Sequence, residues 1–385
     1  MKRKQRLAAV LTAAVMVTAF SGCSKKDKGS MRRELTASQC AQEMGIGINL
    51  GNTMEAYWAD NSRLSTGAST IGDNTPADYE KCWGAVDTTQ ACIDGMKAAG
   101  FNTVRIPVYW GNMMADDGTY TINQDYMNRV QEIVDYCRND DLYVVVNIHH
   151  YDGFLIEHHT KEETLSAVRT LWKQIAEQFR GYSDHLIFEG FNEALGSVQE
   201  GTTLSEDETY AYVNEMNQAF VDTVRSTGGN NANRLLIVSG YWTNIDNTTK
   251  DKFVMPQDTV NDKLMVSVHY IDNAIFWQKM CGSPRWEQYS KDQCELLKNR
   301  FTAEHIPVFL GECTAIYPPE HCMKNMKYQD SSELLQILLD MAADYSFVPV
   351  LWDVNDNFYS RTDCKIKSEA DQAVITEVAG RLAAQ

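Results

Sequence analysis

LIFEGFNEAL, residues 186–195, is an apolar run that stops at an amide and a carboxylate, Asn192 and Glu193. A second run, IPVFLGEC at 306–313, is also apolar and also reaches a glutamate, Glu312, as it ends. A charge at the end of a buried strand costs desolvation free energy unless it is paired or used in chemistry. Two such strands therefore indicate a functional site.

Eight segments of the chain have the composition of strands that are buried on both faces of a parallel sheet. They are rich in β-branched and aromatic residues and are nearly continuous in apolar character. The eight segments are 45–51, 102–108, 142–150, 186–192, 234–240, 264–270, 306–312 and 348–353.

Amphipathic segments lie between these strands. In 88–100, 123–139, 163–180 and 332–345 the apolar residues recur every three or four positions, which predicts helices. Eight strands that alternate with helices predict an α/β fold, a (β/α)8 TIM barrel in a single domain. The alternative, an open doubly wound sheet, would carry a glycine-rich phosphate loop after its first strand. The stretch NLGNTMEA at 49–56 is not such a loop.

The first residues have the layout of a bacterial export signal. They are basic, then apolar over a length too short to span a bilayer comfortably, and FSGC then places small residues before Cys23. The expected segments are a lipoprotein signal peptide at 1–22, a lipidated tether at 23–35 and the barrel at 36–385. This predicts an exported protein that a lipid on Cys23 anchors to the cell membrane. A plain signal peptide or a short membrane anchor is the alternative.

The charge balance limits the kinds of partner. The chain has 35 Lys and Arg against 52 Asp and Glu, a net charge of −17, and nine of the basic residues lie in the first 33 positions. An acidic domain argues against nucleic acid and suits a neutral substrate, and we expect a monomer. Nine cysteines follow Cys23, so at least one has no partner within the chain.

In a TIM barrel the catalytic groups lie at the carboxyl ends of the strands. These ends contribute a polar cluster from seven of the predicted strands: Asn52, Glu55, Arg105, His149, His150, Asn192, Glu193, His269, Glu312 and Trp352. Each residue taken singly has a structural explanation, such as a core ion pair. Together they predict an active site, because unrelated polar residues would scatter over the helices.

Two carboxylates that face each other across a barrel mouth are what glycoside hydrolysis requires. One must be protonated to donate to the leaving oxygen, and the other must be ionised to attack the sugar or to activate water. A cation such as Arg105 would keep Glu312 ionised, whereas Glu193, beside the neutral Asn192, would hold a proton more readily. Asn192 is also a candidate to hydrogen-bond the sugar 2-hydroxyl.

The motifs resemble those of glycoside hydrolase family 5, the cellulase family, and most closely its bacterial endoglucanases. The matching stretches are GINLGNTMEA, the WG and TT of 83–89, GFNTVRIPVYW, VNIHHYDG, LIFEGFNEA, VSVHY, PVFLGE and PVLWD. The resemblance implies that Glu193 is the acid/base and Glu312 the nucleophile of a retaining mechanism. The sugar contacts that it implies are Asn52, Glu55, Arg105, His149, His150, Asn192, His269 and Trp352.

One departure from the family pattern follows the sixth strand. The family usually carries His-x-Tyr there, and the tyrosine hydroxyl hydrogen-bonds the nucleophile. Here the run is His269-Tyr270-Ile271, so Tyr270 stands one place early and strand alternation would turn it away. A local bulge would turn it back. Tyr270 is therefore a candidate binding residue whose role stays open. Glu193 is followed by Ala194 and Leu195, where proline is common in the family.

Flat aromatic rings are natural platforms for sugar faces. The tryptophans in or at the start of loops that follow strands are Trp58, Trp83, Trp110, Trp242, Trp277 and Trp352. Some of them are expected to cap the barrel core instead. No metal or cofactor is expected, because His149 and His150 would point in opposite directions on a strand, which is poor for joint ligation.

The expected activity is that of a retaining, endo-acting β-glycanase on β-1,4-glucan, with a polysaccharide as its partner. Xyloglucan, mixed-linkage glucan and mannan are alternative substrates for the same chemistry. A carbohydrate-binding lipoprotein without catalysis is the alternative from another class, although both glutamates are present. A metal-dependent barrel hydrolase is a third, and insensitivity to chelators would exclude it.

Overall fold

The computed structural model describes residues 30–58, 70–115, 117–150, 160–195, 204–269, 271, 285–314 and 331–384. The expected signal peptide at 1–22, Cys23, Tyr270 and Trp277 lie outside these residues. Among the helices of the described part, none is both long enough and apolar enough to cross a membrane.

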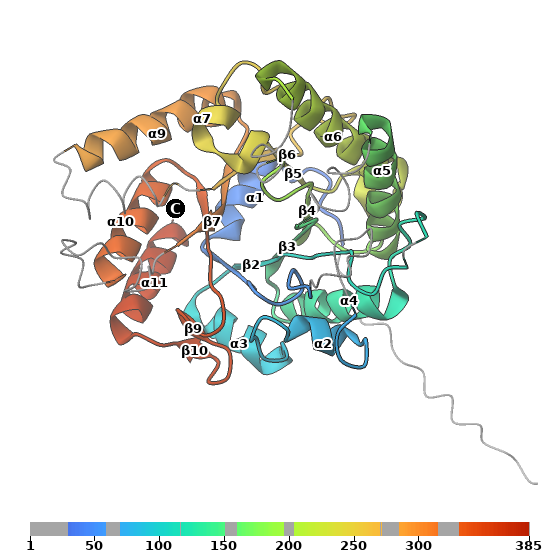
Figure 1. The fold of residues 1–385 in the computed structure, drawn as a ribbon. Helices are drawn as coiled ribbons and strands as arrows, with labels where there is room; N and C mark the ends of the chain where they lie inside the picture. Colours follow the sequence, from blue (N-terminus) through green and yellow to red (C-terminus); the bar gives the residue numbers. More distant parts are fainter. Residues whose placement is uncertain are drawn as a thin grey trace, which may run out of the picture.

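Eight parallel strands form a closed barrel, because β1 pairs with β8 as well as with β2. The strands are β1 (Gly47–Asn49), β2 (Thr103–Ile106), β3 (Tyr143–Asn147), β4 (Leu186–Glu189), β5 (Leu236–Ser239), β6 (Leu264–His269), β7 (Val308–Cys313) and β8 (Val348–Leu351). Figure 1 shows them at the centre of a ring of helices. The prediction of a single-domain TIM barrel is confirmed.

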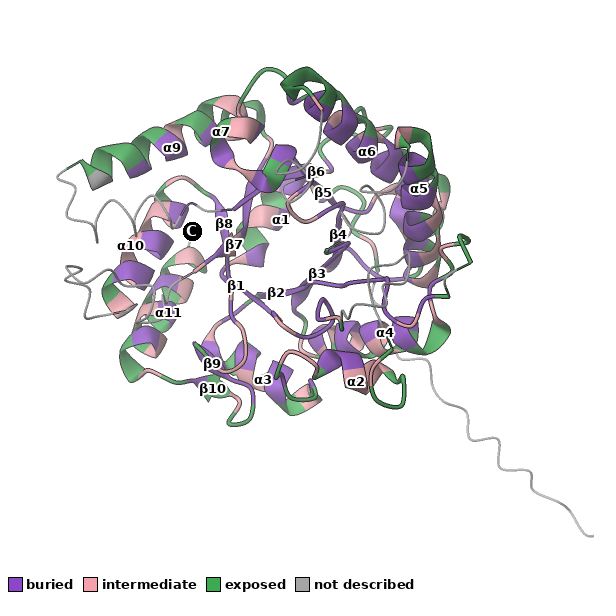
Figure 2. Cartoon of the chain, viewed as in Figure 1, coloured by how far each residue is buried: buried purple, intermediate pink, exposed green. Residues whose placement is uncertain are grey.

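The helices of the described residues surround the barrel, except α1, which covers one end of it. They are α1 (Ala37–Met44), α2 (Pro76–Glu80), α3 (Gln90–Ala99), α4 (Gln124–Asn139), α5 (Lys161–Gln178), α6 (Glu206–Ser226), α7 (Ile245–Thr248), α9 (Trp286–Arg300), α10 (Ser331–Asp344) and α11 (Glu369–Leu382). The short 3-10 turns are η2 (Gly229–Ala232), η3 (Tyr241–Thr243) and η5 (Thr302–Glu304), and β9 (Tyr359–Ser360) pairs with β10 (Lys365–Ile366). Figure 2 shows buried residues on the strands and exposed residues on the outer helix faces.

Helix α5 shows how the sequence produces these elements. The hydroxyl of Thr160 caps its start by accepting from the backbone N–H of Glu163, and the Glu163 side chain accepts from Thr160 in return. Val168, Leu171 and Ile175 recur at helical spacing and are completely buried against the barrel. The cap and the apolar stripe together fix where the helix begins and which face it buries.

Several strands, such as β3 and β4, end earlier than their apolar runs. β3 ends at Asn147, although the apolar pattern predicts a strand as far as His150, and β4 ends at Glu189. The residues that follow leave the barrel hydrogen bonds and form turns at its mouth. These turns carry most of the side chains that were expected to form the site.

Helix α1 closes the opposite end of the barrel. Cys40 and Met44 of this helix pack, with Leu35, into a buried cluster. The other members of the cluster are mostly residues of the barrel strands. Just before the helix, the Arg32 guanidinium binds Asp184, with Nε to Oδ2 at 2.7 Å. The described chain therefore begins at the barrel floor, and the active-site candidates lie at the other end.

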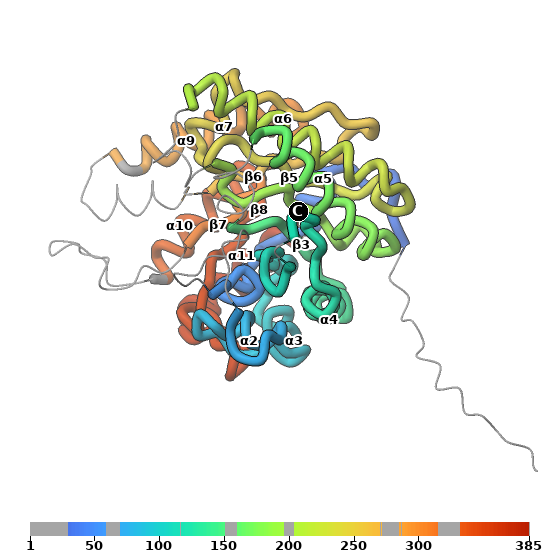
Figure 3. Tube along the Cα trace, turned by 45° about the vertical axis from the view of Figure 1, so that its right-hand side comes forward, coloured from blue at the N-terminus to red at the C-terminus, as the bar shows by residue number. Residues whose placement is uncertain are grey.

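The last segment of the chain packs on helix α3. Tyr359 of β9 donates its hydroxyl to the carbonyl of Cys92 in α3 at 2.9 Å. Gln372 of α11 donates to the carbonyl of Ala99 at the end of α3, at 2.8 Å. Figure 3 shows this red segment beside the blue and cyan helices. These contacts tie the last segment to the first helices of the ring.

The cysteines of the described residues are free thiols, namely Cys40, Cys82, Cys92, Cys137, Cys294, Cys313 and Cys364. Burial raises the pKa of the Cys82 thiol to about 11 and that of the Cys92 thiol to about 12, so both are protonated at neutral pH. Cys281 and Cys322 lie outside the described residues.

Candidate active site

Glu193 lies on a strained turn that follows β4. The backbone is left-handed at Glu193, with φ 41°, and again at Leu195, with φ 60°. The backbone N–H of Trp242 donates to the carbonyl of Ala194 at 2.8 Å and holds this turn against η3. Left-handed residues other than glycine cost on the order of 1 kcal/mol each and concentrate at functional sites. The turn directs the Glu193 side chain, which is 28% exposed, into the barrel mouth.

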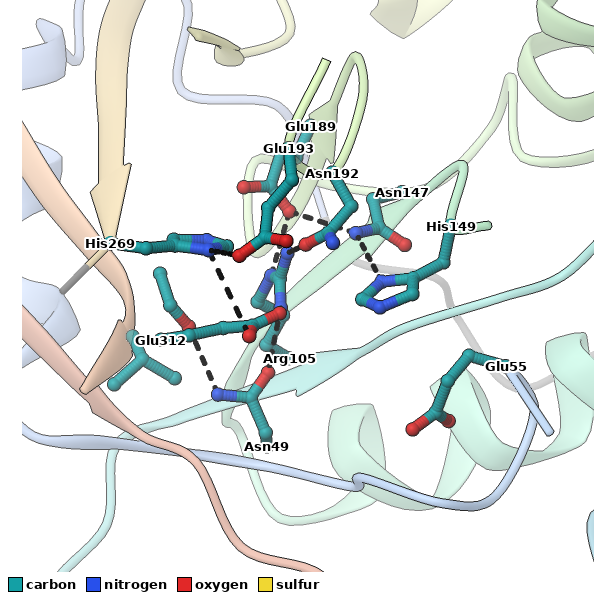
Figure 4. A network of polar contacts seen from close by, with 12 residues as sticks. Asn49, Glu55, Arg105, Asn147, His149, Glu189, Asn192, Glu193, His269 and Glu312 are labelled. Atoms are coloured by element: carbon teal, nitrogen blue, oxygen red, sulfur yellow. Dashed lines mark hydrogen bonds and ion pairs between the residues drawn. The ribbon is translucent and has the colours of Figure 1, made fainter. Parts of the chain in front are cut away.

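Glu312 lies where the pairing of β6 with β7 shifts by one residue. The residue before His269 pairs with Leu310, whereas His269 itself pairs with Glu312, so Gly311 is an extra residue in β7. A Cβ on Gly311 would lie 3.0 Å from Nε2 of His269, which is closer than side chains normally pack. Such a bulge redirects the next side chain. Glu312 consequently points into the same mouth as Glu193 (Figure 4).

Arg105 joins several of the candidate residues. Its buried guanidinium donates Nε to Glu189 Oε2 at 2.7 Å, Nη1 to Glu312 Oε1 at 2.8 Å and to Asn49 Oδ1 at 3.0 Å, and Nη2 to Asn192 Oδ1 at 2.8 Å. Burial alone would lower the pKa of Arg105, but the charges of Glu189 and Glu312 outweigh burial and raise it. The expected ion pair between Arg105 and Glu312 is present.

His269 faces both glutamates through one ring nitrogen. Its Nδ1 shares a hydrogen bond of 3.1 Å with Glu193 Oε1 and lies 3.8 Å from Glu312 Oε2. Burial opposes the charged imidazolium, but the charge of Glu312 and the bond to Glu193 raise the pKa of His269 above its ordinary value. His269 thus holds the two carboxylates close to one another.

The spacing of the carboxylates bears on the stereochemistry of a glycosidase. One side-chain oxygen of Glu193, one of Glu312 and Nδ1 or Nε2 of His269 all lie within 4.8 Å of one another. Retaining enzymes hold their two carboxyl groups about 5–5.5 Å apart, and inverting enzymes about 6.5–9.5 Å apart to admit a water. An oxygen separation of at most 4.8 Å is compatible with the shorter spacing, at which one carboxylate attacks the sugar directly.

His149, His150 and Trp352 form an aromatic wall beside the pair. The His149 ring lies parallel to Trp352, with centroids 6.2 Å apart, and meets the edge of His150 at 4.4 Å. The expectation that the two histidines point in opposite directions was wrong, because β3 ends before them and His150 is left-handed, with φ 53°. Burial, and then the neighbouring His150, lower the pKa of His149 well below its ordinary value, so it is neutral.

Glu55 is placed differently from the other candidates. It is completely buried, and its carboxylate accepts the backbone N–H groups of Asn52 and, at 3.0 Å, of Thr53. Burial raises the pKa of Glu55 to about 7, although these hydrogen bonds oppose the shift. In Figure 4 it lies apart from the two glutamates. Glu55 shapes the turn after β1, and the half-buried Asn52 is the residue of this turn that remains accessible.

Four buried polar residues beneath the pair were not anticipated. They are Asn49, Asn147, Glu189 and Ser267. Asn147 Nδ2 donates to Glu189 Oε2 at 3.1 Å, and Ser267 Oγ donates to Glu189 Oε1 at 2.9 Å. Each is a polar residue within an apolar strand, as in LIFE, VVVN and LMVS, and that interruption was the available signal. They form a polar layer that supports Arg105.

The tryptophans near the barrel mouth differ in how far their side chains are exposed. Trp110 is completely buried and donates its indole N–H to the carbonyl of Asn147 at 2.8 Å, so it caps the core and offers no sugar platform. Trp58 and Trp242 are 44% and 39% exposed, and both follow barrel strands. Trp242 is moreover left-handed, with φ 57°. These two exposed indoles can receive a sugar face.

The glutamates and His269 are the group of possible metal ligands found among the described residues. A cation between them would lie close to the Arg105 guanidinium, which already forms an ion pair with Glu312, with Nη1 and Oε1 2.8 Å apart. Repulsion between these positive charges disfavours metal binding. The arrangement is better suited to proton transfer and nucleophilic attack.

Comparison with protein families identifies one match over most of the chain. The model of the family described as cellulase (glycosyl hydrolase family 5) matches residues 65–358.

Several relatives are similar over nearly the whole length. Endoglucanase A of Paenibacillus barcinonensis is 33% identical over 91% of this chain and 90% of its own. A xyloglucan-specific endo-beta-1,4-glucanase of Bacteroides ovatus is 38% identical over 89% of this chain and 70% of its own.

Solved structures agree with the sequence relatives. A broad specificity endoglucanase from Ruminococcus champanellensis with bound cellotriose has a TM-score of 0.73 and 32% identity, covering 90% of this chain and 99% of that one. A Bacteroides ovatus xyloglucanase in complex with a heptasaccharide has a TM-score of 0.77 and 30% identity, covering 92% and 78%.

Proposed function

Because the chain belongs to glycosyl hydrolase family 5, we propose that it is a retaining, endo-acting β-1,4-glucanase in which Glu193 is the acid/base and Glu312 the nucleophile. The observation that carries this assignment is the difference between the two carboxylates. Glu312 forms an ion pair with the buried guanidinium of Arg105, with Nη1 and Oε1 2.8 Å apart. Glu193 instead shares a hydrogen bond with Nδ1 of His269 and lies on the accessible turn after β4.

The first step forms a covalent intermediate. A Glu312 oxygen attacks the anomeric carbon as the glycosidic bond breaks, and Glu193 donates its proton to the departing sugar oxygen. Asn192 accepts from Arg105 through Oδ1, which leaves its amide N–H groups to donate to the sugar 2-hydroxyl. That contact strengthens in the transition state and contributes to the rate.

The second step releases the sugar. Glu193, now ionised, takes a proton from water, and the water oxygen attacks the anomeric carbon. The ester bond breaks, Glu312 recovers its charge beside Arg105, and Glu193 is again protonated. Two inversions leave the product with the configuration of the substrate.

Glucan is the substrate class that the relatives support. Their names specify endoglucanases, and one structural relative is described as having broad specificity. Xyloglucan is the second candidate, since the Bacteroides ovatus relative is xyloglucan-specific. The exposed rings of Trp58 and Trp242 are suited to a chain bound along the mouth, and we infer endo action from them.

Export is a separate part of the proposal. FSGC at 20–23 motivates lipidation of Cys23 and anchoring outside the cytoplasm. Cells fed labelled fatty acid should label the wild type and not Cys23→Ala. Equal labelling of the two would exclude the anchor.

Activity on purified polysaccharides tests the enzymatic proposal. Carboxymethyl cellulose, xyloglucan, mixed-linkage glucan and mannan should be compared, with Glu312→Gln as the inactive control. We expect a rapid fall in glucan viscosity, mixed oligosaccharides and β-configured first products. Activity confined to mannan, release of a single short product from chain ends, or α-configured first products would contradict the proposal.

A further inference from the structure

Glu189 is a completely buried carboxylate at the end of β4. It accepts three hydrogen bonds, from Arg105 Nε at 2.7 Å, Ser267 Oγ at 2.9 Å and Asn147 Nδ2 at 3.1 Å. With no exposed surface, it cannot touch a substrate. A buried charge is costly unless it is paired, so its value has to lie in what it does to these neighbours.

The contact with Nε fixes the orientation of the guanidinium. Nε lies at the base of the planar fork, so a partner held there sets the plane in which both Nη groups point. Those groups reach the two residues of the site that Arg105 serves, Glu312 at 2.8 Å and Asn192 at 2.8 Å. Glu189 consequently positions the nucleophile and the amide proposed to bind the 2-hydroxyl through one side chain.

Glu189 also competes with Glu312 for the positive charge of Arg105. Two carboxylates, Glu189 and Glu312, share a single buried guanidinium. If Glu312 had the guanidinium to itself, its anion would be more stable and therefore a weaker nucleophile. Among the described residues, the other ionisable groups that face the pair are His269 from β6, Glu193 from the turn after β4, and His149, which is neutral.

We propose that Glu189 is a positioning residue for the reaction, which orients Arg105 and limits how strongly Arg105 stabilises the Glu312 anion. This inference rests on the proposed function, because it assumes that Glu312 is the nucleophile. It assigns the β4 carboxylate a role in catalysis without any contact to sugar.

The test compares Glu189→Gln with Glu189→Asp. Gln keeps the size and can still accept from Arg105, while its amide donates to Ser267, whose hydroxyl can accept. Asp keeps the charge but shortens the side chain. The measurement is the pH dependence of kcat/KM on an aryl β-cellobioside, with the thermal midpoint recorded for each variant.

Glu189→Gln should move the acidic limb of the profile to lower pH by about 0.5 unit or more, since Glu312 would lose a nearby negative charge. Its kcat should fall about tenfold or more, because the neutral amide holds the Arg105 guanidinium less firmly and Glu312 also becomes a weaker nucleophile. Glu189→Asp should lower the activity but leave the limb within about 0.2 unit of the wild type, because the charge is kept.

An acidic limb that stays in place in folded Glu189→Gln would overturn the inference, as would an equal shift in both variants. If Glu189→Gln does not fold, Arg105→Lys tests whether the guanidinium positions the site. The lysine ammonium has no planar fork and cannot contact Glu189, Glu312 and Asn192 together. Retention of kcat within about threefold in that variant would refute positioning through the fork. An inactive wild type would instead refute the proposed function itself.

Discussion

Nη1 of Arg105 lies 2.8 Å from Oε1 of Glu312, and the guanidinium that makes this contact is completely buried. Water does not screen a buried pair as it screens a surface pair, so the contact separates the chemical behaviour of the two site glutamates. Glu193 faces the imidazole of His269 instead, at 3.1 Å. The proposed division of roles between the two glutamates follows from this asymmetry.

Replacement of Glu193 by alanine should affect substrates according to their leaving groups. Polysaccharide turnover should fall by about 10²–10⁴, because the departing sugar oxygen then receives no proton. A dinitrophenyl β-cellobioside, whose leaving group needs no proton, should still form the intermediate and release dinitrophenol in a burst. Stopped-flow absorbance measures the burst, and a loss of equal size on both substrates would argue against the acid role.

Tyr270→Phe tests the departure from the family pattern. The residue at the usual tyrosine position is Ile271, which is buried in the core and has no hydroxyl to donate to Glu312. If Tyr270 supplies the hydroxyl instead, its loss should lower kcat by tenfold or more, about 1.4 kcal/mol in the barrier. An unchanged kcat for a folded variant would show that Tyr270 is not the donor.

Trp242→Ala should weaken binding of long substrates. Loss of the exposed ring should raise KM for glucan about threefold to tenfold, which corresponds to about 0.5–1.5 kcal/mol of aromatic contact. Hydrolysis of a small aryl cellobioside should change by less than about twofold if the ring serves sugars beyond the cleaved bond. Tyr289→Ala, an exposed ring on α9, is the matched control. Equal effects of the two variants would exclude a specific platform.

Glu55→Gln should change how stability depends on pH. Burial raises the pKa of Glu55 to about 7 in the folded protein, so the folded state holds a proton that the unfolded state releases above pH 4.5. The free energy of unfolding of the wild type should therefore decrease between these pH values, by on the order of 1–3 kcal/mol.

The Gln variant, which has no proton to release, should lack this decrease. Urea unfolding at several pH values measures the difference, with Glu177→Gln on the exposed face of α5 as the control. A decrease of the same size in Glu55→Gln would mean that another group is responsible.

The order of strands and helices could be predicted because buried parallel strands have nearly continuous apolar sequences. LYVVVNIHH, for example, identifies β3 by composition alone. The point at which a strand ends could not be predicted, because apolar residues also continue into buried turns. This is why His149 and His150 leave β3 and bring their rings together.

The pair of glutamates could be predicted because a charged residue that ends an apolar strand is conspicuous. The support beneath it was harder to predict, since Glu189 and Ser267 come from different strands and meet only after the barrel closes. The bulge at Gly311 was likewise not predictable, because a glycine in a strand can also serve close packing. The meeting of Arg105, Glu193, His269 and Glu312 at one end of the barrel was therefore predictable, whereas their contacts follow from the closed barrel.

The most direct test of the account is to trap the intermediate. Incubation with an activated 2-deoxy-2-fluoro-β-cellobioside should raise the protein mass by one fluorocellobiosyl group, since fluorine at carbon 2 slows release more than formation. Peptide mapping by mass spectrometry should locate the group on Glu312, and Glu312→Gln should not be labelled. Attachment to Glu193 or another carboxylate, or turnover of the fluorosugar without any adduct, would contradict the assignment of Glu312 as the nucleophile.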